Sequence, residues 1–447
     1  MMSEKGIPLT SHAPEEIIAW HNARAVATQE FVGQALALAR RLPSATHAVN
    51  LCEDRYLFLL AFAALLIRGQ VCLLPPNRAT GVVSSVVAKY PGSYCLVDRS
   101  SDELALPQFF VSLQSDAYAV RTSPLIDSGQ EAVVIFTSGS TGAPQPYRKF
   151  WGDLVRGTML AARRFALDEF AGGTVIATVP PQHMYGLEST ILYGLHSPLA
   201  VHGGQPFYPE DVRQALLEIS GPRLLITTPV HLRACVGAAL AWPPMGLIIC
   251  ATAPLSTLLA AQAEAHFGCP VREVFGSTET GAIASRHTLT EPLWRPYDGV
   301  QLHCKADGRC QVEADFLPQP MPLNDIIESQ AAGFQLLGRD SDMINIAGKR
   351  ASLGDLTRRL LDIPGVDDAA LVLQEDASHE RGGRICALVV APELSEQAIL
   401  AAMAPLMDAV FIPRTLYRVD RLPRSETGKL PRDELLTLLT RLRQRGV

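Results

Sequence analysis

The order of apolar and polar positions in this chain predicts strands and helices in alternation. Short, almost wholly apolar runs predict buried strands, and longer stretches with helical spacing of apolar residues predict amphipathic helices. The first unit is a strand over 48–51, a helix over 56–67 and a strand over 71–74, an order that predicts parallel pairing with a right-handed crossover. Further strands are expected at 94–97, 133–136, 174–179, 224–227, 247–250 and 271–274, and helices at 14–41, 81–89, 152–165, 209–218, from 230, and at 256–267.

Repetition of these units predicts the α/β class, with a large N-terminal layered α/β domain of mostly parallel sheets. Ligands in such domains collect at the loops that follow the carboxyl ends of strands. The loops that begin at Thr137, Pro180, Ala251 and Phe275 are therefore expected to line one cleft.

After residue 300 the pattern changes to short β-type runs, and a compact mixture of strands and helices follows residue 342. Strands are expected there at 369–374, 385–390 and 415–419, and helices at 354–361 and 395–404. This mixture predicts a small α+β C-terminal domain. We therefore expect an N-terminal domain over 1–338, a hinge over 339–342 and a C-terminal domain over 343–447.

Composition narrows the function classes. A chain of 447 residues that is 48% apolar can bury a large core, and a net charge of -6 without a basic block disfavours nucleic acid as a partner. The apolar run 56–67 is shorter than the ~20 residues needed to cross a bilayer, and no signal peptide is visible at the N-terminus. Nine cysteines without metal-ligand spacing are interpreted as core thiols of a protein in a reducing compartment, the cytoplasm.

The strand over 133–136 runs into a loop suited to an anion. The glycines allow positive φ and convergence of backbone N–H groups, and the hydroxyls add further donors. An ordinary Ser/Gly turn is the competing interpretation, whereas the phosphate loop of nucleotide triphosphatases is excluded, because Pro144 and Gln145 stand where that loop needs Gly-Lys. The loop residues are Thr137, Ser138, Gly139, Ser140, Thr141 and Gly142.

TSGSTG followed by Ala143-Pro144 resembles the phosphate loop of the adenylate-forming superfamily, which includes acyl- and aryl-CoA synthetases, carrier-protein-loading adenylation domains and luciferases. FGSTE, residues 275–279, resembles the family's aromatic-Gly-x-Thr-Glu segment. The resemblance implies an ATP site in which the aromatic ring stacks on adenine, the threonine contacts the α-phosphate and the glutamate binds Mg²⁺. The residues are Phe275, Gly276, Ser277, Thr278 and Glu279.

Later segments follow in the family's order. Asp325 occupies the place of the ribose-binding aspartate, although its context is Leu-Asn-Asp, and Arg339 is also expected at the ribose. LPRSETGKL, residues 422–430, closely matches the family's last motif and implies that Lys429 is the catalytic lysine. Gly348 and Lys349 match a turn that reaches the thiol tunnel only after a mobile C-terminal domain rotates.

The resemblance implies activation of a carboxylic acid by ATP and Mg²⁺ to an acyl-adenylate, then transfer to the pantetheine thiol of coenzyme A or of an acyl carrier protein. His183 is expected to gate the thiol tunnel beside the acid pocket. The pocket has no aspartate for an amino group, which disfavours amino acids and favours aryl or fatty acids. Its expected lining is His183, Met184, Tyr185, Gly186, Ala251, Thr252 and Ala253.

Departures from the family pattern leave alternatives open. Gln145 replaces the customary loop lysine, and either Arg148 or Lys149 is a candidate substitute. A non-catalytic or regulatory nucleotide-binding homologue is the competing class, but a mere binder has no need of both Glu279 and Lys429. An oxygenase of luciferase type has no feature in its favour, and coenzyme A and a carrier protein remain equal candidates for the thiol.

Overall fold

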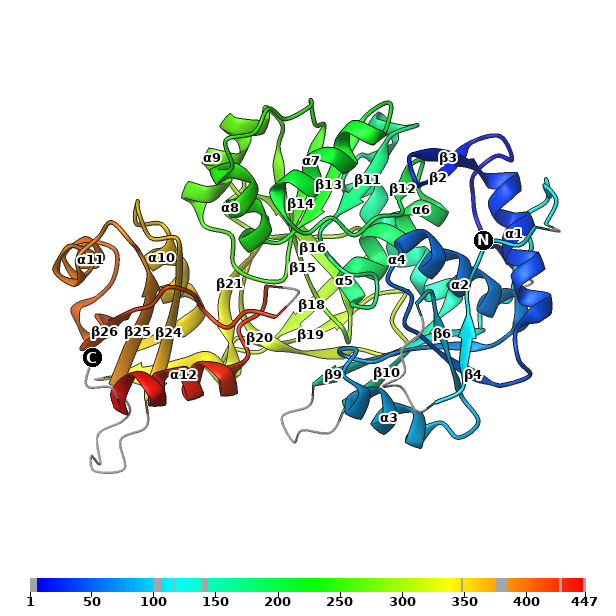
Figure 1. The fold of residues 1–447 in the computed structure, drawn as a ribbon. Coiled ribbons are helices and arrows are strands. Elements are labelled where there is room, and N and C mark those ends of the chain that lie inside the picture. The colour runs from blue at the N-terminus through cyan, green and yellow to red at the C-terminus, as the bar shows by residue number, and fades with distance from the viewer. Residues whose placement is uncertain are drawn as a thin grey trace.

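The computed structural model describes residues 6–99, 106–115, 117–138, 144–346, 349–374, 384–425 and 428–444. Two large sheets and a smaller one form the N-terminal part, and a smaller C-terminal domain lies at one end of the molecule (Figure 1). The predicted α/β class with a small C-terminal α+β domain is confirmed.

The first large sheet is six-stranded and parallel except at one edge. Its central strands have four residues each and are almost wholly buried, and β5 and β6 are apolar throughout, as expected for a parallel sheet that helices cover on both faces. The helices connected with it are α1 (Thr28–Arg41), α2 (Arg55–Arg68) and α3 (Thr80–Lys89). In spatial order the strands are β10 (Pro144–Phe150), β9 (Glu131–Ser138), β5 (Val71–Leu74), β4 (His47–Asn50), β6 (Tyr94–Val97) and β7 (Gln108–Phe110).

The second large sheet has nine strands, and its centre is parallel. Its helices are α4 (Trp151–Arg164), α7 (Pro209–Glu218), α8 (Pro229–Gly237) and α9 (Thr257–Phe267). Its strands in order are β17 (Arg295–Pro296), β16 (Gly281–His287), β15 (Val271–Ser277), β14 (Leu247–Cys250), β13 (Arg223–Thr227), β11 (Thr174–Ala177), β12 (Ala200–His202), β2 (Ile17–His21) and β3 (Arg24–Ala27).

A four-stranded antiparallel sheet leads from this domain to the C-terminal one, which has its own apolar core. The sheet contains β18 (Gln301–Cys304), β19 (Arg309–Glu313), β20 (Met321–Gln330) and β21 (Gly333–Arg339). The C-terminal domain contains β22 (Met343–Ile346), β23 (Lys349–Ser352), α10 (Leu353–Leu361), β24 (Asp368–Gln374), β25 (Arg384–Val390), α11 (Glu396–Met403), β26 (Thr415–Arg418) and α12 (Arg432–Gln444). The remaining named strands, β1 (Ile7–Pro8) and β8 (Leu125–Ile126), pair with each other.

The predicted helix over 14–41 is wrong in its first half. Residues 17–27 form the β2–β3 hairpin, and the helix begins only at Thr28. Asn22 and Ala23 both adopt positive φ, which makes the tight turn between the strands. Pairing of β2 with β12 adds the hairpin to the nine-stranded sheet. The expected helix over 56–67 is confirmed as α2, and no helix within the described ranges is long and apolar enough to cross a membrane.

Arg55 joins the two large sheets. It is fully buried at the start of α2, and its guanidinium donates to the carbonyl oxygens of Ala177 at 2.8 Å and Val179 at 3.0 Å. It also donates to the carbonyls of His202 and Gly204. A buried cation is stable only when such acceptors replace water. Arg55 thereby fixes the carboxyl ends of β11 and β12, from which the predicted acid pocket extends.

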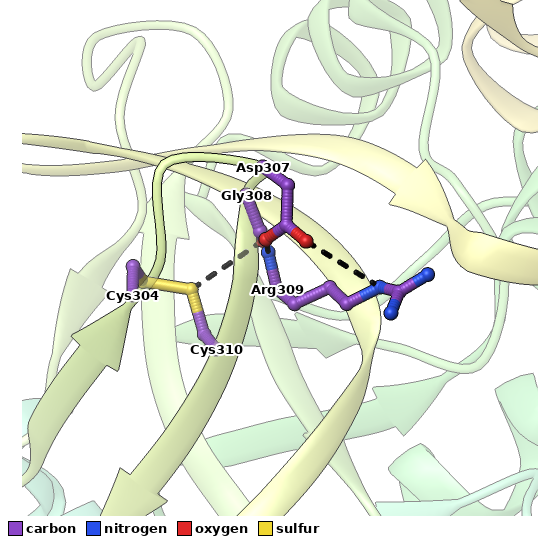
Figure 2. Close-up of a disulfide and its surroundings, with 5 residues drawn as sticks. All are labelled: Cys304, Asp307, Gly308, Arg309 and Cys310. Atoms are coloured by element: carbon purple, nitrogen blue, oxygen red, sulfur yellow. Dashed lines mark hydrogen bonds and ion pairs between the residues drawn. A yellow bond between two sulfur atoms is a disulfide. The ribbon is translucent and has the colours of Figure 1, made fainter.

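Two cysteines correct the expectation that all nine are thiols. Cys304 and Cys310 lie directly opposite each other on β18 and β19 and form a disulfide, which Figure 2 shows beside the Asp307–Arg309 ion pair. A separation of six residues reveals such a pair only when the hairpin register is known. The other seven cysteines are free and buried, as expected of core thiols.

Stability is expected to fall below pH 6.5 because of buried histidines. Burial, with a further contribution from His12, lowers the pKa of His196 to about 4, and burial also lowers the pKa of His12. Between pH 4 and 6.5 the unfolded chain therefore binds a proton at His196 that the native chain does not, at a cost of about 1.4 kcal/mol per pH unit. Thermal melts at pH 7 and pH 5 should show a smaller loss for His196→Phe than for the wild type. An equal loss in both would contradict this, and His303→Phe, at an exposed site, is the control.

Candidate functional site

The predicted site loops follow the carboxyl ends of strands in both large sheets. β11, β13, β14 and β15 are parallel neighbours, so the loops after them lie at one edge of the nine-stranded sheet. The six-stranded sheet reaches this edge through Lys149 of β10, whose Nζ donates to the Glu279 carbonyl oxygen at 2.7 Å. The two sheets therefore come into contact next to the loop that follows β15.

A tight turn between β15 and β16 carries Thr278 and Glu279. Ser277 and Thr280 close it reciprocally, because each backbone N–H lies 3.2 Å from the other residue's hydroxyl oxygen. Gly276 is exposed, and a Cβ there would lie 2.2 Å from the Gly281 carbonyl oxygen. The two strands approach so closely that only glycine fits, which leaves a bare backbone surface next to the turn.

Phe275 lies in an aromatic cluster. Its ring centroid is 5.7 Å from that of Trp294 and 5.6 Å from that of Phe334, and only 9% of its surface is exposed. The neighbouring aromatic rings therefore cover much of Phe275. Its stacking on adenine remains a prediction.

Asp325 and Arg339 are brought together by the β20–β21 register, in which they are direct partners. Burial raises the pKa of Asp325, and the charges of Asp342 and Glu279 act in the same direction, whereas Arg339 opposes them. Asp325, Arg339 and Glu279 thus share one electrostatic environment. Because β20 and Glu279 are far apart in sequence, this proximity comes from the fold alone.

Contacts of Arg424, Ser425 and Gly428 place Lys429 in the same environment. Gly428 N–H donates to the Ser425 carbonyl at 2.8 Å, and Arg424 anchors the loop by a two-contact ion pair with Asp368. Gly428 has φ +74° and packs against Thr228, at the carboxyl end of β13. Surrounding protein and the charge of Arg339 lower the pKa of Lys429, although solvent still reaches its side chain, and Glu279 partly offsets that shift.

His183 lies within electrostatic range of Lys429 and of Arg78, a residue that follows β5 of the first sheet. Burial lowers its pKa to about 4, and the cations Lys429 and Arg78 act in the same direction. His183 is therefore neutral at physiological pH. Its neighbours Gln182 and Arg78 both donate to the Cys52 carbonyl, at 3.0 Å and 2.8 Å, and so tie the loop after β11 to the loop after β4.

The other predicted pocket residues differ in their surroundings. Met184 packs into the main core, and the Tyr185 hydroxyl donates to the Ile249 carbonyl at 2.9 Å. A Cβ at Gly186 would lie 2.0 Å from the Pro180 carbonyl oxygen, so glycine is required there. These three residues position the start of the helical stretch after His183, which continues as a π-helical turn over Leu187–Leu192.

The loop after β14 is backbone-strained. Thr252 has φ +81°, a conformation that is unusual for a β-branched residue and that tends to occur at functional sites. Ala251 N–H donates to the Thr227 carbonyl at 3.3 Å, which holds the loop against β13. Ala251 is buried, while Thr252 and Ala253 are partly exposed.

Some predicted residues are not brought into the cleft. Lys349 forms an ion pair with Asp408 within the C-terminal domain, whereas Lys429 lies within electrostatic range of Glu279 and Arg339. Gly348 lies outside the described residues, as do Gly139, Ser140, Thr141 and Gly142, and for Ser138 only the backbone is described. Thr137 is partly buried at the end of β9.

Tyr147 and Glu188 are site residues that the sequence did not reveal. Burial raises the pKa of Tyr147, and Glu279 acts in the same direction while Thr137 opposes it, so both residues lie near its hydroxyl. The Glu188 carboxylate accepts from Ala282 N–H at 3.2 Å, on the other side of the Glu279 turn. Little in the sequence indicated that these two residues belong to the site. Tyr147 lies in a polar segment with two prolines, and a glutamate such as Glu188 is usually found at the protein surface.

The site chemistry fits a nucleotide with a divalent cation. In the part of the chain that the structure describes, no group of three or more His, Cys, Asp or Glu could hold a metal ion. A magnesium ion at Glu279 would need oxygens from bound phosphates and water, which is the usual manner of Mg²⁺ binding at nucleotide sites. Lys429 and Arg339, which lie within electrostatic range of each other, are two cations that could neutralise phosphate charge.

Comparisons with known proteins give the same picture. The profile of the AMP-binding enzyme family matches residues 40–305, more than half of the chain. A 4-coumarate–CoA ligase of Rhodobacter capsulatus is 33% identical over 314 residues, which cover 66% of this chain and 74% of that protein. ATP-bound MatB of Rhodopseudomonas palustris has a TM-score of 0.80 at 17% identity, covering 95% of this chain and 96% of that one.

A further structural neighbour is the o-succinylbenzoate–CoA synthetase MenE of Bacillus subtilis in complex with ATP and magnesium. Its TM-score is 0.79 at 19% identity, and the match covers 95% of this chain and 97% of that one. At such identities the structural likeness establishes the fold. Together with the family profile and the ligase relative, it identifies the chain as a member of the AMP-binding enzyme family, the adenylate-forming acid–CoA ligases.

Proposed function

We propose that this protein is an ATP- and Mg²⁺-dependent acid–thiol ligase that acts on an aryl or fatty acid. The acid's carboxylate attacks the α-phosphorus of ATP, and pyrophosphate leaves. A pantetheine thiol then attacks the acyl-adenylate, and AMP leaves. The observation that carries this proposal is the position of Lys429, a residue of the C-terminal domain, beside Glu279 and Arg339 of the large domain.

Each charged residue has a role that follows from its surroundings. Both reactants are anions, so positioning and charge neutralisation supply most of the catalysis. Lys429 stabilises charge that develops at the α-phosphate, while Glu279 holds the magnesium ion. Asp325 accepts hydrogen bonds from the ribose hydroxyls, with Arg339 beside it, and the hydroxyls of Thr137–Thr141 and Thr278 contact the phosphates.

An aryl acid is the better supported of the two substrate classes. The 4-coumarate–CoA ligase relative is named for an aromatic acid. Neutral His183 and the loop Ala251–Ala253 offer a pocket without a carboxylate that would bind an amino group. His183 gates the passage of the thiol beside this pocket.

The thiol step requires a second position of the C-terminal domain. We propose that the domain 343–447 turns about residues 339–342, withdraws Lys429 and brings Gly348 and Lys349 to the thiol tunnel. The Lys349–Asp408 ion pair lies within the C-terminal domain and can travel with it. Coenzyme A and an acyl carrier protein present the same pantetheine arm, and either is a possible acceptor. The need for ATP and the seven buried thiols support a cytoplasmic location.

A pyrophosphate-exchange assay tests the proposal. Wild-type protein is incubated with ATP, Mg²⁺, labelled pyrophosphate and benzoic, cinnamic, short-chain or long-chain acids, with and without coenzyme A. We expect acid-dependent exchange with aromatic acids and release of AMP when coenzyme A is added. Exchange with one acid but no consumption of coenzyme A would indicate a carrier protein, and no exchange with any acid would contradict ligase activity on these classes.

A further inference from the structure

We propose that Tyr147, Lys149 and Glu188 form a clamp that positions the turn carrying Glu279. These three residues come from β10 and from the helical stretch after His183, and we call them the Glu279 clamp. The inference rests on the proposed function, because it concerns the residue that would hold the magnesium ion. It also answers which charged residue near the phosphate loop acts at the site when Gln145 replaces the usual lysine.

The pleat of β10 decides between Arg148 and Lys149. Neighbouring residues of a strand point to opposite faces. Arg148 points outward, where its guanidinium makes two contacts with Glu131, at 2.7 Å and 2.6 Å. Tyr147 and Lys149 therefore share the other face, and both reach Glu279. Arg148 is thereby excluded as the substitute.

Lys149 holds the backbone of the metal-binding residue. Its Nζ lies 2.7 Å from the Glu279 carbonyl oxygen, across 130 positions of sequence. Burial lowers the pKa of Lys149, and Glu188, Glu279 and Asp153 oppose that shift. A lysine placed so deep is retained as a cation by these carboxylates and the carbonyl it contacts. Loss of this contact would free the turn from the six-stranded sheet.

Glu188 holds the same turn from the opposite side. Both of its carboxylate oxygens lie 3.2 Å from Ala282 N–H, the first residue beyond Gly281. A Cβ at Gly281, which has φ +71°, would lie 2.5 Å from the nearer oxygen, so the close approach depends on glycine. Glu188 also lines a small cavity of about 10 Å³ with Tyr193 and Ala282. The turn is thus contacted by Lys149 at Glu279 and by Glu188 at Ala282. Burial raises the pKa of Glu188 to about 7, and Lys149 opposes that shift.

Tyr147 completes the clamp at the side chain itself. Its hydroxyl lies close enough to Glu279 and to Thr137, the first residue of the phosphate loop, for both residues to act on its pKa. A neutral donor at this position would orient the carboxylate without cancelling its charge. In metal sites, partners that orient a ligand in this way tune metal affinity.

The test compares variants on the two faces of β10. Lys149→Met and Tyr147→Phe remove clamp contacts, Lys149→Arg keeps the charge, and Arg148→Met is the matched control on the outer face. Affinity for Mn²⁺ in the presence of ATP is measured by electron paramagnetic resonance of free Mn²⁺. Pyrophosphate exchange then gives kcat and the Mg²⁺ concentration for half-maximal rate.

We expect Lys149→Met to weaken Mn²⁺ binding and raise the half-maximal Mg²⁺ concentration by ~10-fold or more, the size typical of lost ligand-orienting partners. At saturating Mg²⁺ most of the rate should return, and Lys149→Arg should recover part of the affinity. Arg148→Met should match the wild type. A Lys149→Met variant with wild-type Mn²⁺ affinity would overturn the clamp, whatever its melting temperature.

The test remains decisive if Lys149→Met does not fold or if the wild type shows no exchange. Should Lys149→Met not fold, Tyr147→Phe, which removes one oxygen atom, takes its place, and unchanged Mn²⁺ affinity in that variant overturns the proposal. Mn²⁺ binding with ATP requires no carboxylic acid. Absence of acid-dependent exchange in the wild type would therefore contradict the proposed function and leave the clamp measurable.

Discussion

Lys429→Ala is expected to lower acyl-adenylate formation by ~10²-fold or more, because a cation placed at developing charge contributes a few kcal/mol to the transition state. In the structure the ammonium lies beside Glu279 and Arg339, and its pKa is lowered by the surrounding protein and by Arg339. The measurement is single-turnover release of pyrophosphate at saturating ATP and acid. Lys429 is also solvent-exposed, so the variant should fold with an unchanged melting temperature.

Two controls make the result specific. Lys305→Ala removes an exposed lysine of the β18–β19 turn and should release pyrophosphate at the wild-type rate. Binding of ATP to Lys429→Ala, followed by equilibrium titration, should change much less than the rate. Wild-type pyrophosphate release from Lys429→Ala would refute its catalytic assignment.

Glu279→Gln is expected to have the second-largest effect. A neutral amide oxygen is a much weaker ligand than a carboxylate for a hard cation such as Mg²⁺. We expect the rate at ordinary Mg²⁺ to fall by ~10²-fold, since the metal neutralises phosphate charge in the transition state. A titration of exchange rate against Mg²⁺ measures this directly. The amide keeps the shape of the side chain, and the Lys149 contact to the Glu279 backbone carbonyl remains possible.

The profile of this titration separates Glu279 from the clamp. Excess Mg²⁺ should restore most of the rate of Lys149→Met but little of that of Glu279→Gln, because only the second variant lacks a ligand atom. Glu313→Gln, in an exposed pair with His303 on the neighbouring sheet, is the matched substitution. Equal Mg²⁺ curves for Glu279→Gln and Glu313→Gln would exclude Glu279 as the metal ligand.

The parallel core could be predicted because its strands are buried on both faces. Runs such as Val71–Leu74 and Leu247–Cys250 are wholly apolar and buried, so their strand character does not depend on a periodicity that a helix could imitate. Residues 17–20 gave no such certainty. Their apolar side chains fit a helix as well as a strand. Position 23, which adopts φ +59°, is an alanine, and alanine is not one of the residue types from which a turn is predicted.

β10 was missed for a different reason. Its sequence, PQPYRKF, contains two prolines and little apolar alternation, which argues against a central strand. It is an edge strand, where prolines are tolerated, and it folds back antiparallel on β9. Its contribution to the site comes from contacts across 130 positions of sequence, and no local pattern encodes those. The motifs at 275–279 and around Lys429 could be found because their chemistry is local.

The disulfide between β18 and β19 bears on the proposed rotation of the C-terminal domain, because it restrains a hairpin that contacts the hinge. The cross-link joins the two strands next to the hairpin turn (Figure 2). The five residues between the cysteines therefore stay attached to the four-stranded sheet. Arg309, one of these residues, faces Asp340, with 3.7 Å between Nη2 and the carboxylate oxygen. An exposed ion pair of this kind contributes little stability by itself. Because the disulfide restrains the hairpin turn, however, Arg309 stays within reach of Asp340. Asp340, the second residue of the proposed hinge, should therefore stay with the large domain, which would place the pivot of the motion at Ser341 and Asp342.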